Sequence, residues 1–169
     1  MISVPLSRCR IAGLMTLVMI LLMCPVASAA ETSLPHAQDL QADIRHAELT
    51  GLPLIVMISL RGCPHCEVIR RTHLLPLLRG GQARGIPHIR QIEINGKLVM
   101  RDFDGRAITH AGFARTYKIK VAPVVMFFGA KGEMLAEPLV GAMIPDFYGA
   151  HFDAALAEAI SKMQRVGGR

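Results

Sequence analysis

The 169-residue sequence contains no tryptophan, only four cysteines and no basic run longer than Arg70-Arg71. Although the formal net charge is +6, the charged residues are scattered, and aromatic residues are not interleaved with the basic ones. A nucleic-acid-binding surface needs clustered Lys and Arg side chains, so we expect no nucleic acid partner. Internal repeats, low-complexity tracts and interdomain linkers are also lacking, which indicates one globular domain.

The first thirty residues have the composition of a secretory signal peptide. Arg8 and Arg10 precede an apolar block over residues 11–24, and the small residues of Ala27-Ser28-Ala29 or Ser28-Ala29-Ala30 provide a cleavage site. The block is shorter than the about 20 residues that span a bilayer, so cleavage is favoured over anchoring.

We therefore predict a signal peptide at residues 1–30 and one domain at residues 31–169. The resulting location is periplasmic, with no stable membrane insertion after signal cleavage. Two alternatives stay open, an uncleaved anchor and lipidation at Cys24. The segment Leu21-Leu22-Met23-Cys24 is similar to a lipoprotein cleavage box, although Met23 is bulky where a small residue belongs.

Removal of the signal peptide would leave two cysteines, Cys63 and Cys66. Cys63-Pro64-His65-Cys66 directly follows the apolar run Leu54–Leu60 and precedes a helical pattern. At such a strand-to-helix junction a C-x-x-C pair can open and close a disulfide reversibly, and the helix amides favour the thiolate of the first cysteine. Since no structural disulfide is then possible elsewhere, the pair is expected to perform redox chemistry.

The apolar periodicity predicts an α/β domain with a mixed sheet flanked by helices. In the first helix, Leu40, Ile44 and Ala47 form the apolar face, and Asp39 and Asp43 lie off it. In chain order we expect a helix at 36–49, a buried strand at 54–60, a helix from 66 to about 75 or kinked to Gly80-Gly81, a strand at 89–94, a returning hairpin arm at 97–101, a loop at 102–105, a helix to Tyr117 capped by Thr109, a strand at 124–128, an edge strand at 133–140 and a helix at 145–163.

The segment from Val121 to Phe128, followed by Gly132-Glu133, resembles the part of thioredoxin-like proteins that places a cis-proline against the C-x-x-C. Over about residues 51–163 the chain is similar to that superfamily. The resemblance implies a thioredoxin-like fold, a cis bond before Pro123, and an Ala122 backbone that pairs with an extended substrate strand.

Within the superfamily, the segment Arg61–Cys66, the loop Asp102–Gly105 and the long final helix resemble exported thioredoxin-like proteins of bacterial sulfur-oxidation systems. By the superfamily resemblance, Cys63 is the attacking thiolate and Cys66 the resolving thiol. The Pro64-His65 dipeptide is that of the oxidising DsbA-type enzymes, in which the histidine stabilises the thiolate. The implied catalytic residues are Cys63, Cys66, His65 and Pro64, with Ala122 and Pro123 binding substrate and Arg61 as a further candidate for tuning.

Three features depart from these families. DsbA-type enzymes insert a helical domain between the C-x-x-C and the cis-proline, and too few residues separate Cys66 from Pro123 for such a domain. Met57 replaces the buried acid that these families often carry, so proton transfer to the resolving thiol by that route is not expected. Gly62 stands where a tryptophan usually precedes the motif.

Other uses of the motif are less well matched. A c-type haem site needs C-x-x-C-H, and residue 67 is Glu. Sco-like copper chaperones carry C-x-x-x-C, one residue longer. A zinc site could recruit Cys63 and Cys66 with two histidines, but no second C-x-x-C or H-x-x-x-H completes it. The candidate histidines, which we expect on the surface, are His65, His73, His88 and His110.

The sequence therefore predicts a periplasmic thiol-disulfide oxidoreductase without a cofactor or metal. Its partners are protein thiols and disulfides, together with a membrane electron-transfer redox partner. We favour the reduction of disulfides in exported proteins, of the sulfur-oxidation or cytochrome-maturation type. The alternatives are a DsbA-like disulfide oxidase or isomerase, and a non-enzymatic thioredoxin-like module that binds a partner or a metal.

Overall fold

The computed structural model describes residues 33–80, 85, 87–141 and 145–167. The predicted signal peptide at residues 1–30 lies outside these ranges. Among the helices that are described, none combines the length and apolar character needed to cross a membrane.

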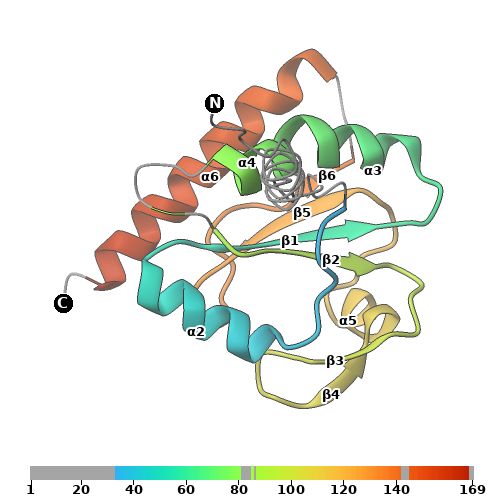
Figure 1. The fold of residues 1–169 in the computed structure, drawn as a ribbon, viewed down its shortest axis with the longest axis horizontal. Coiled ribbons are helices and arrows are strands. Elements are labelled where there is room, and N and C mark those ends of the chain that lie inside the picture. The colour runs from blue at the N-terminus through green and yellow to red at the C-terminus, as the bar shows by residue number, and fades with distance from the viewer. Residues whose placement is uncertain (1–32, 81–84, 86, 142–144, 168–169) are drawn as a thin grey trace, which may run out of the picture. The chain divides into compact units, whose positions relative to one another are not determined.

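A four-stranded mixed sheet forms the centre of the domain (Figure 1). Its strands are β1 (Leu54–Ser59), β2 (Ile89–Glu93), β5 (Val124–Phe128) and β6 (Leu139–Val140). The order across the sheet is β2-β1-β5-β6. The pair β1–β2 is parallel, whereas β1–β5 and β5–β6 are antiparallel.

The register brings distant segments to one edge of this sheet. Ser59 at the end of β1 pairs with Glu93 at the end of β2, and Ile58 pairs with Val124 at the start of β5. The residues that follow β1 and the residues that precede β5 therefore leave the sheet at the same edge. The C-x-x-C motif and Pro123 occupy these two positions.

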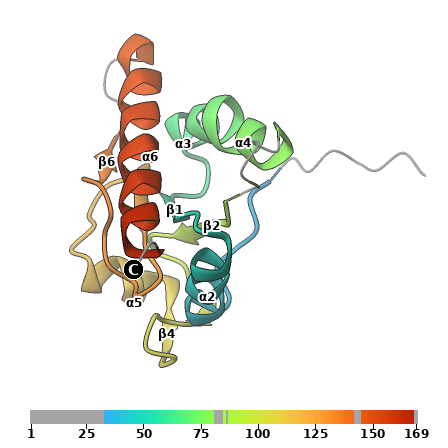
Figure 2. The same cartoon turned by 90° about the vertical axis from the view of Figure 1, so that its left-hand side faces the viewer.

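Helices cover both faces of the sheet (Figures 1 and 2). One face carries α6 (Pro145–Gly167) and a continuous helical segment made of α3 (Pro64–Ile69), η1 (Arg70–Leu74) and α4 (Leu75–Gly80). The other face carries α2 (Leu40–Thr50), α5 (His110–Thr116) and a hairpin of β3 (Val99–Arg101) and β4 (Ala107–Thr109). This arrangement is an α/β thioredoxin-like fold, as the sequence predicts.

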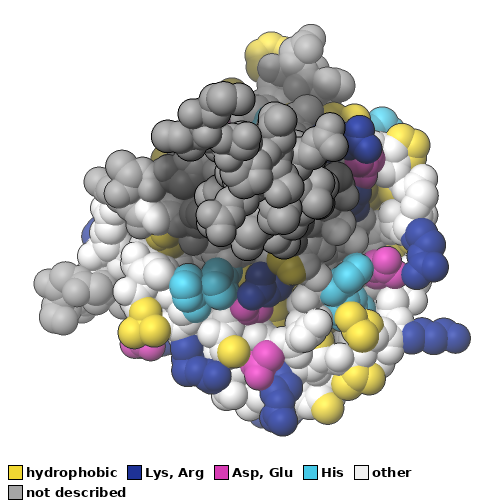
Figure 3. All heavy atoms as spheres, viewed as in Figure 1, with side chains coloured by type: hydrophobic (Ala, Val, Ile, Leu, Met, Phe, Trp, Pro, Cys, Tyr) yellow, Lys and Arg dark blue, Asp and Glu magenta, His cyan; other side chains and the backbone are white. Residues whose placement is uncertain are grey.

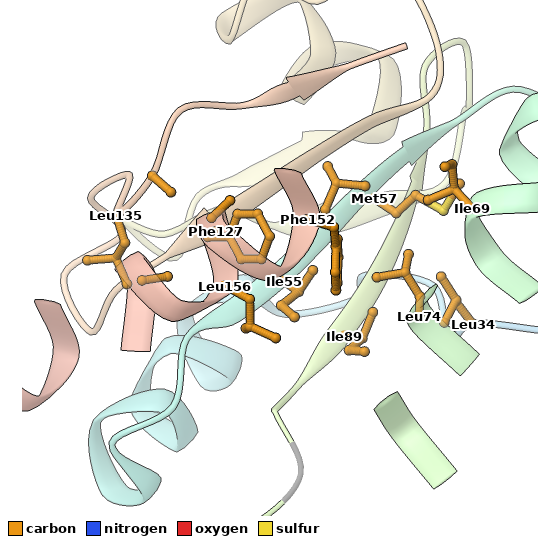
Figure 4. Close-up of a cluster of buried hydrophobic side chains, with 14 of the residues drawn as sticks. Leu34, Ile55, Met57, Ile69, Leu74, Ile89, Phe127, Leu135, Phe152 and Leu156 are labelled. Atoms are coloured by element: carbon orange, nitrogen blue, oxygen red, sulfur yellow. The ribbon is translucent and has the colours of Figure 1, made fainter. Parts of the chain in front are cut away.

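Each face of β1 contributes to its own hydrophobic core. Ile55 and Met57 pack into the cluster beneath α3 and α6, as Figure 4 shows, whereas Val56 and Ile58 pack against α2 and α5. Every residue of β1 is buried. Burial on both faces explains the unbroken apolar run in the sequence.

The first helix differs from the prediction at its start and on its polar side. It begins at Leu40, because the Asp39 carboxylate accepts a 2.8 Å hydrogen bond from the amide of Ala42 and caps the first turn. Asp43 is buried, although the sequence placed it off the apolar face. Its carboxylate is paired with Arg90, which allows a charge to be buried there.

The helical segment after the motif passes through Pro76 and ends at Gly80. Of the two predicted ends, at about residue 75 or at Gly80-Gly81, the structure has the second. Residues Arg70–Leu74 form a π-helical turn, in which the Leu75 amide donates to the Arg70 carbonyl. This wider turn lies directly before Pro76, so the proline ring is accommodated near the start of α4 without ending the helical segment.

The predicted return of residues 97–101 along β2 is wrong. The outer edge of β2 is already occupied, since the Ala37 amide donates to the Gln91 carbonyl and the Gln91 amide donates to the Pro35 carbonyl, at 2.9 and 2.8 Å. The chain turns at Glu93–Gly96, and β3 pairs with β4 in a separate hairpin closed by the predicted 102–105 loop.

The predicted edge strand at 133–140 is largely wrong as well. Leu135 donates to the Phe127 carbonyl at 2.8 Å, but regular pairing begins only where Leu139 faces Val125. The residues between these points bulge from the ladder, and Pro138 has no amide hydrogen to donate. The predictions for β5, for the Thr109 cap of α5 and for the start of α6 are confirmed.

Candidate active site

Cys63 and Cys66 are joined by a disulfide whose Cα atoms are 5.3 Å apart. Cys63 is the N-cap residue of α3, with extended backbone angles. Its sulfur lies 3.1 Å from the amide nitrogen of Cys66, which donates a hydrogen bond to it. In the reduced state, an amide hydrogen and the positive end of the helix would both favour a thiolate at this position.

The two sulfur atoms differ in exposure. Cys66 is only 1% exposed and belongs to the core beneath α3, whereas Cys63 is partly exposed at the edge of that core. A partner molecule can therefore reach Cys63 first.

A tight turn between β1 and α3 fixes the position of Cys63. The Cys63 amide donates to the Leu60 carbonyl at 3.2 Å, and Gly62 has a left-handed backbone with φ of +73°. Glycine adopts that conformation at little cost, which gives a physical reason for the glycine at this turn. Pro64 then begins the helix, where a missing amide hydrogen is tolerated.

The remaining residues of the motif face solvent. Pro64 and His65 are both exposed on the first turn of α3. Arg61 is also exposed, and its guanidinium lies 3.4 Å from the Glu93 carboxylate. Arg61 therefore contributes to an ion pair on the rim of the site.

Pro123 and Ala122 lie at the same edge of the sheet. The Ala122–Pro123 peptide bond is cis, and Pro123 is buried. Its carbonyl accepts a 2.7 Å hydrogen bond from the Gly141 amide, which ties it to the end of β6. Ala122 and Cys63 pack against the same buried cluster, the one that contains Cys66. The fold thus brings together the motif and the residues for which the resemblance implies substrate binding.

Met57 is fully buried on the α3 face of the sheet and lies beside Ile69 (Figure 4). The nearest polar groups along the strands are Ser59, two residues further on, and Gln91, which pairs with Met57 across β1 and β2. Both are buried, and the Arg70 side chain reaches them from η1. The sequence alone does not predict that these three polar side chains meet. Ser59, as the one polar residue in the apolar run, was the available indication.

An open depression of about 380 Å³ adjoins the motif. Cys63 lines it together with Ser59, Arg61, Glu67, Arg70 and Gln91. The attacking sulfur is therefore bordered by arginine and glutamate side chains on this side. Two exposed apolar residues, Leu60 and Val121, precede Arg61 and Ala122 in the sequence.

The expectation that the histidines lie on the surface is wrong for His110. It is buried, its Nδ1 accepts from the Glu93 amide at 3.1 Å, and its Nε2 lies 3.0 Å from the Ala37 carbonyl. Burial lowers the pKa of His110 below its ordinary value. The two backbone contacts fit a neutral ring with the proton on Nε2.

His88 and His73 lie in two different environments. His88 contacts the Asp43 carboxylate at 3.1 Å and stacks on His46, and burial lowers its pKa. His73 packs against Tyr148 on α6, and burial lowers its pKa too. Within the ranges described, no group of three or more His, Cys, Asp or Glu side chains is arranged to hold a metal ion.

The charged side chains are mixed in sign. Over the described part of the face in Figure 3, basic, acidic and histidine side chains lie next to one another. Several are paired in the structure, for example Arg90 with Asp43 and Lys162 with Glu158.

Comparison with models of protein families finds no match to this chain, and comparison with curated proteins finds none either. Among solved structures, the chain is similar to the DsbH oxidoreductase, with 14% identity, a TM-score of 0.49, and coverage of 80% of this chain and 90% of that one. It is also similar to the C-terminal domain of Neisseria meningitidis DsbD in its oxidised form, with 17% identity, a TM-score of 0.46, and coverage of 71% and 98%. A thioredoxin-fold protein from Helicobacter pylori has 14% identity, a TM-score of 0.45, and coverage of 70% and 85%. The strand order, the register and the placement of the motif carry the fold assignment of this chain.

Proposed function

We propose that this protein is a thiol-disulfide oxidoreductase that uses Cys63 and Cys66. The observation that carries the proposal is the placement of Cys63: its sulfur is reachable, caps α3 and is bonded to a cysteine that is buried. A purely structural disulfide needs neither an accessible sulfur nor a helix N-terminus beneath it. A reversible dithiol benefits from both.

The reaction follows from these two positions. In the reduced protein, the Cys63 thiolate attacks one sulfur of a substrate disulfide, forms a mixed disulfide and releases the first substrate thiolate. Cys66 loses its proton and attacks the Cys63 sulfur, which releases the second substrate thiolate and closes the protein disulfide. The substrate gains two electrons, the protein loses two, and the released thiolates take up protons according to the pH.

Protein substrates fit the surroundings of Cys63. Ala122 precedes Pro123 and β5 at the end of the sheet where the motif follows β1, and it packs against the same buried cluster as Cys63. A backbone segment in this place can pair with an extended peptide. Leu60 and Val121 are exposed apolar residues that a substrate would cover. We assign Ala122 and Pro123 to substrate binding on this basis.

We further propose that the protein acts as a reductase of exported proteins in the periplasm, after cleavage of residues 1–30. In the described residues, only β2, the β3–β4 hairpin and α5 separate α4 from β5, so the inserted helical domain of DsbA-type oxidases is not found there. A reductase in an oxidising compartment must receive electrons, and we infer a membrane-bound dithiol as its donor. The sulfur-oxidation or cytochrome-maturation setting follows from the sequence resemblance.

The second candidate is a disulfide oxidase or isomerase, favoured by the exposed His65 on the first turn of α3. A two-way assay separates the candidates. In one direction, this protein in its reduced form is mixed with insulin, and the reduction of the insulin disulfides is followed. In the other direction, this protein with its disulfide formed is mixed with a reduced, unfolded protein, and the oxidation of that protein's thiols is followed. The reductase proposal predicts faster reduction of insulin. Faster oxidation of the unfolded protein would favour the second candidate, and transfer in neither direction would contradict both.

A further inference from the structure

A half-buried arginine stands beside the candidate redox site. The Arg70 side chain is 15% exposed and lines the same depression as Cys63. Its own amide donates to the carbonyl of Cys66, one helical turn earlier. Arg70 is therefore linked to Cys66 by a backbone hydrogen bond, and its side chain lines the same depression as Cys63.

Its guanidinium is held from several sides. Nε and Nη2 lie 3.1 and 3.0 Å from the same amide oxygen of Gln91, and Nη2 lies 3.4 Å from the Ser59 hydroxyl. Nη1 is paired with the Glu67 carboxylate. A planar guanidinium with contacts in three directions has little freedom to move, so its positive charge has a fixed place.

The carboxylate of Glu67 is shared by two arginines. Arg70 and Arg71 both pair with this single carboxylate. Arg71 is 72% exposed and does not line the depression. Of the two arginines, only Arg70 therefore carries its charge on the side of Cys63, where burial reduces screening by solvent. Besides Arg70 and Glu67, the charged residues that line the depression are Arg61 and Glu93, which pair with each other at 3.4 Å.

The geometry points to Arg70 as a positioning residue that holds a fixed positive charge beside Cys63 and stabilises its thiolate. This inference rests on the proposed thiol-disulfide exchange. An opposite charge close to an ionisable group favours the charged form, so Arg70 favours the reduced protein over the disulfide. Ser59 and Gln91 serve this role by fixing the guanidinium.

Arg70→Gln removes the charge and keeps a polar side chain with hydrogen-bond donors, and Arg71→Gln is the matched control on the next residue. Each protein is expressed from the full chain and reduced, and the rate at which iodoacetamide alkylates Cys63 is measured against pH. The same proteins are equilibrated with glutathione, in which two glutathione thiols reduce the protein disulfide and form one glutathione disulfide.

For Arg70→Gln we expect the alkylation profile to move to higher pH, with a drop of about threefold or more in the equilibrium constant for reduction. Arg71→Gln should match the unmodified protein, and Arg70→Lys should retain most of the effect of the charge. Glu67→Gln removes the opposing charge and should move the profile to lower pH. It also provides the test if Arg70→Gln fails to fold, because a merely structural role of the Arg70–Glu67 pair gives no reason for a shift to lower pH, and an unchanged profile would then overturn the inference.

Equal profiles for Arg70→Gln and Arg71→Gln, or shifts of the same sign for Arg70→Gln and Glu67→Gln, would overturn the inference. A different result would contradict the proposed function. In that case the unmodified protein transfers no electrons to or from protein substrates, although the alkylation profiles of Arg70→Gln and Arg71→Gln still differ from each other.

Discussion

The backbone amide of Cys66 donates a 3.1 Å hydrogen bond to the sulfur of Cys63. This contact makes Cys63 both the cap of α3 and one end of the disulfide. The other end, Cys66, is sealed in the core. Under the proposed function, this difference in exposure lets Cys63 meet the substrate before Cys66.

Cys63→Ala should abolish insulin reduction, because the buried Cys66 sulfur cannot reach a protein disulfide. Cys66→Ala should instead accumulate mixed disulfides between Cys63 and substrate proteins, since the resolving thiol is gone. Non-reducing gel electrophoresis after acid quenching measures these adducts. Insulin reduction by the Cys63→Ala protein, or mixed disulfides formed on Cys66 in that protein, would contradict the assignment of Cys63 as the attacking residue.

Gly62→Ala should destabilise the protein by about 1–2 kcal/mol, the cost of a left-handed backbone for a residue with a Cβ atom. Gly62 has φ of +73°, and a Cβ atom there would meet nothing within 4 Å. The cost therefore comes from the backbone alone. Urea unfolding measures it.

The matched control is Gly80→Ala, at the end of α4, where a Cβ atom is also unobstructed and φ is not positive. Alanine should leave stability unchanged there or raise it by up to about 1 kcal/mol. Similar losses at Gly62 and Gly80 would contradict the role assigned to the Leu60–Cys63 turn.

Asp43→Ala should destabilise the fold by about 3–5 kcal/mol, the usual cost of breaking a buried ion pair. The Asp43 carboxylate is held by the Arg90 guanidinium at 2.6 Å and by His88 at 3.1 Å. The substitution leaves Arg90 without its partner. Glu48→Ala, at an exposed position of the same helix, should change the free energy of unfolding by less than about 0.5 kcal/mol. Equal effects of the two substitutions would show that the Asp43 pair contributes little.

Stability should fall as the pH drops below about 6.5, the ordinary pKa of histidine. Burial lowers the pKa of His110 in the folded protein, so the unfolded chain binds the proton first as the pH falls. The folded state is then disfavoured by up to about 1.4 kcal/mol per pH unit for each such group, until the folded protein is protonated as well. His73 and His88 contribute in the same direction.

Urea unfolding between pH 7.5 and 5 tests this linkage. His110→Gln should lower stability at neutral pH and flatten its decline with acidity, because one of the coupled groups is removed. His151→Gln changes an exposed histidine on α6 and should keep the original slope. An unchanged slope in His110→Gln would contradict a buried neutral ring at this position.

The sequence was sufficient for the parts of the fold that local patterns specify. The apolar run at 54–60 identified a strand buried on both faces, Thr109 identified a helix cap, and the C-x-x-C identified the pair of cysteines. Each of these depends on neighbouring residues and on backbone chemistry. Such features can be inferred without knowledge of the tertiary structure.

What the sequence left undetermined depends on contacts between distant residues. Asp43 is buried because Arg90, far along the chain, lies opposite it. His110 is buried because Ala37 and Glu93 supply its hydrogen-bond partners. Arg70 had no visible role until the fold placed Ser59 and Gln91 on adjacent strands beneath it. The hairpin error has the same origin, since the outer edge of β2 is occupied by an earlier segment.

The reduction potential of the Cys63–Cys66 pair, measured by equilibration with glutathione after expression of the full chain, tests the central claim most directly. A reductase should have a potential close to that of thioredoxin, about −270 mV. A potential near that of DsbA, about −120 mV, would contradict the proposed direction and favour the oxidase. A disulfide that resists exchange, with a potential below about −300 mV, would indicate a structural bridge and contradict redox catalysis altogether.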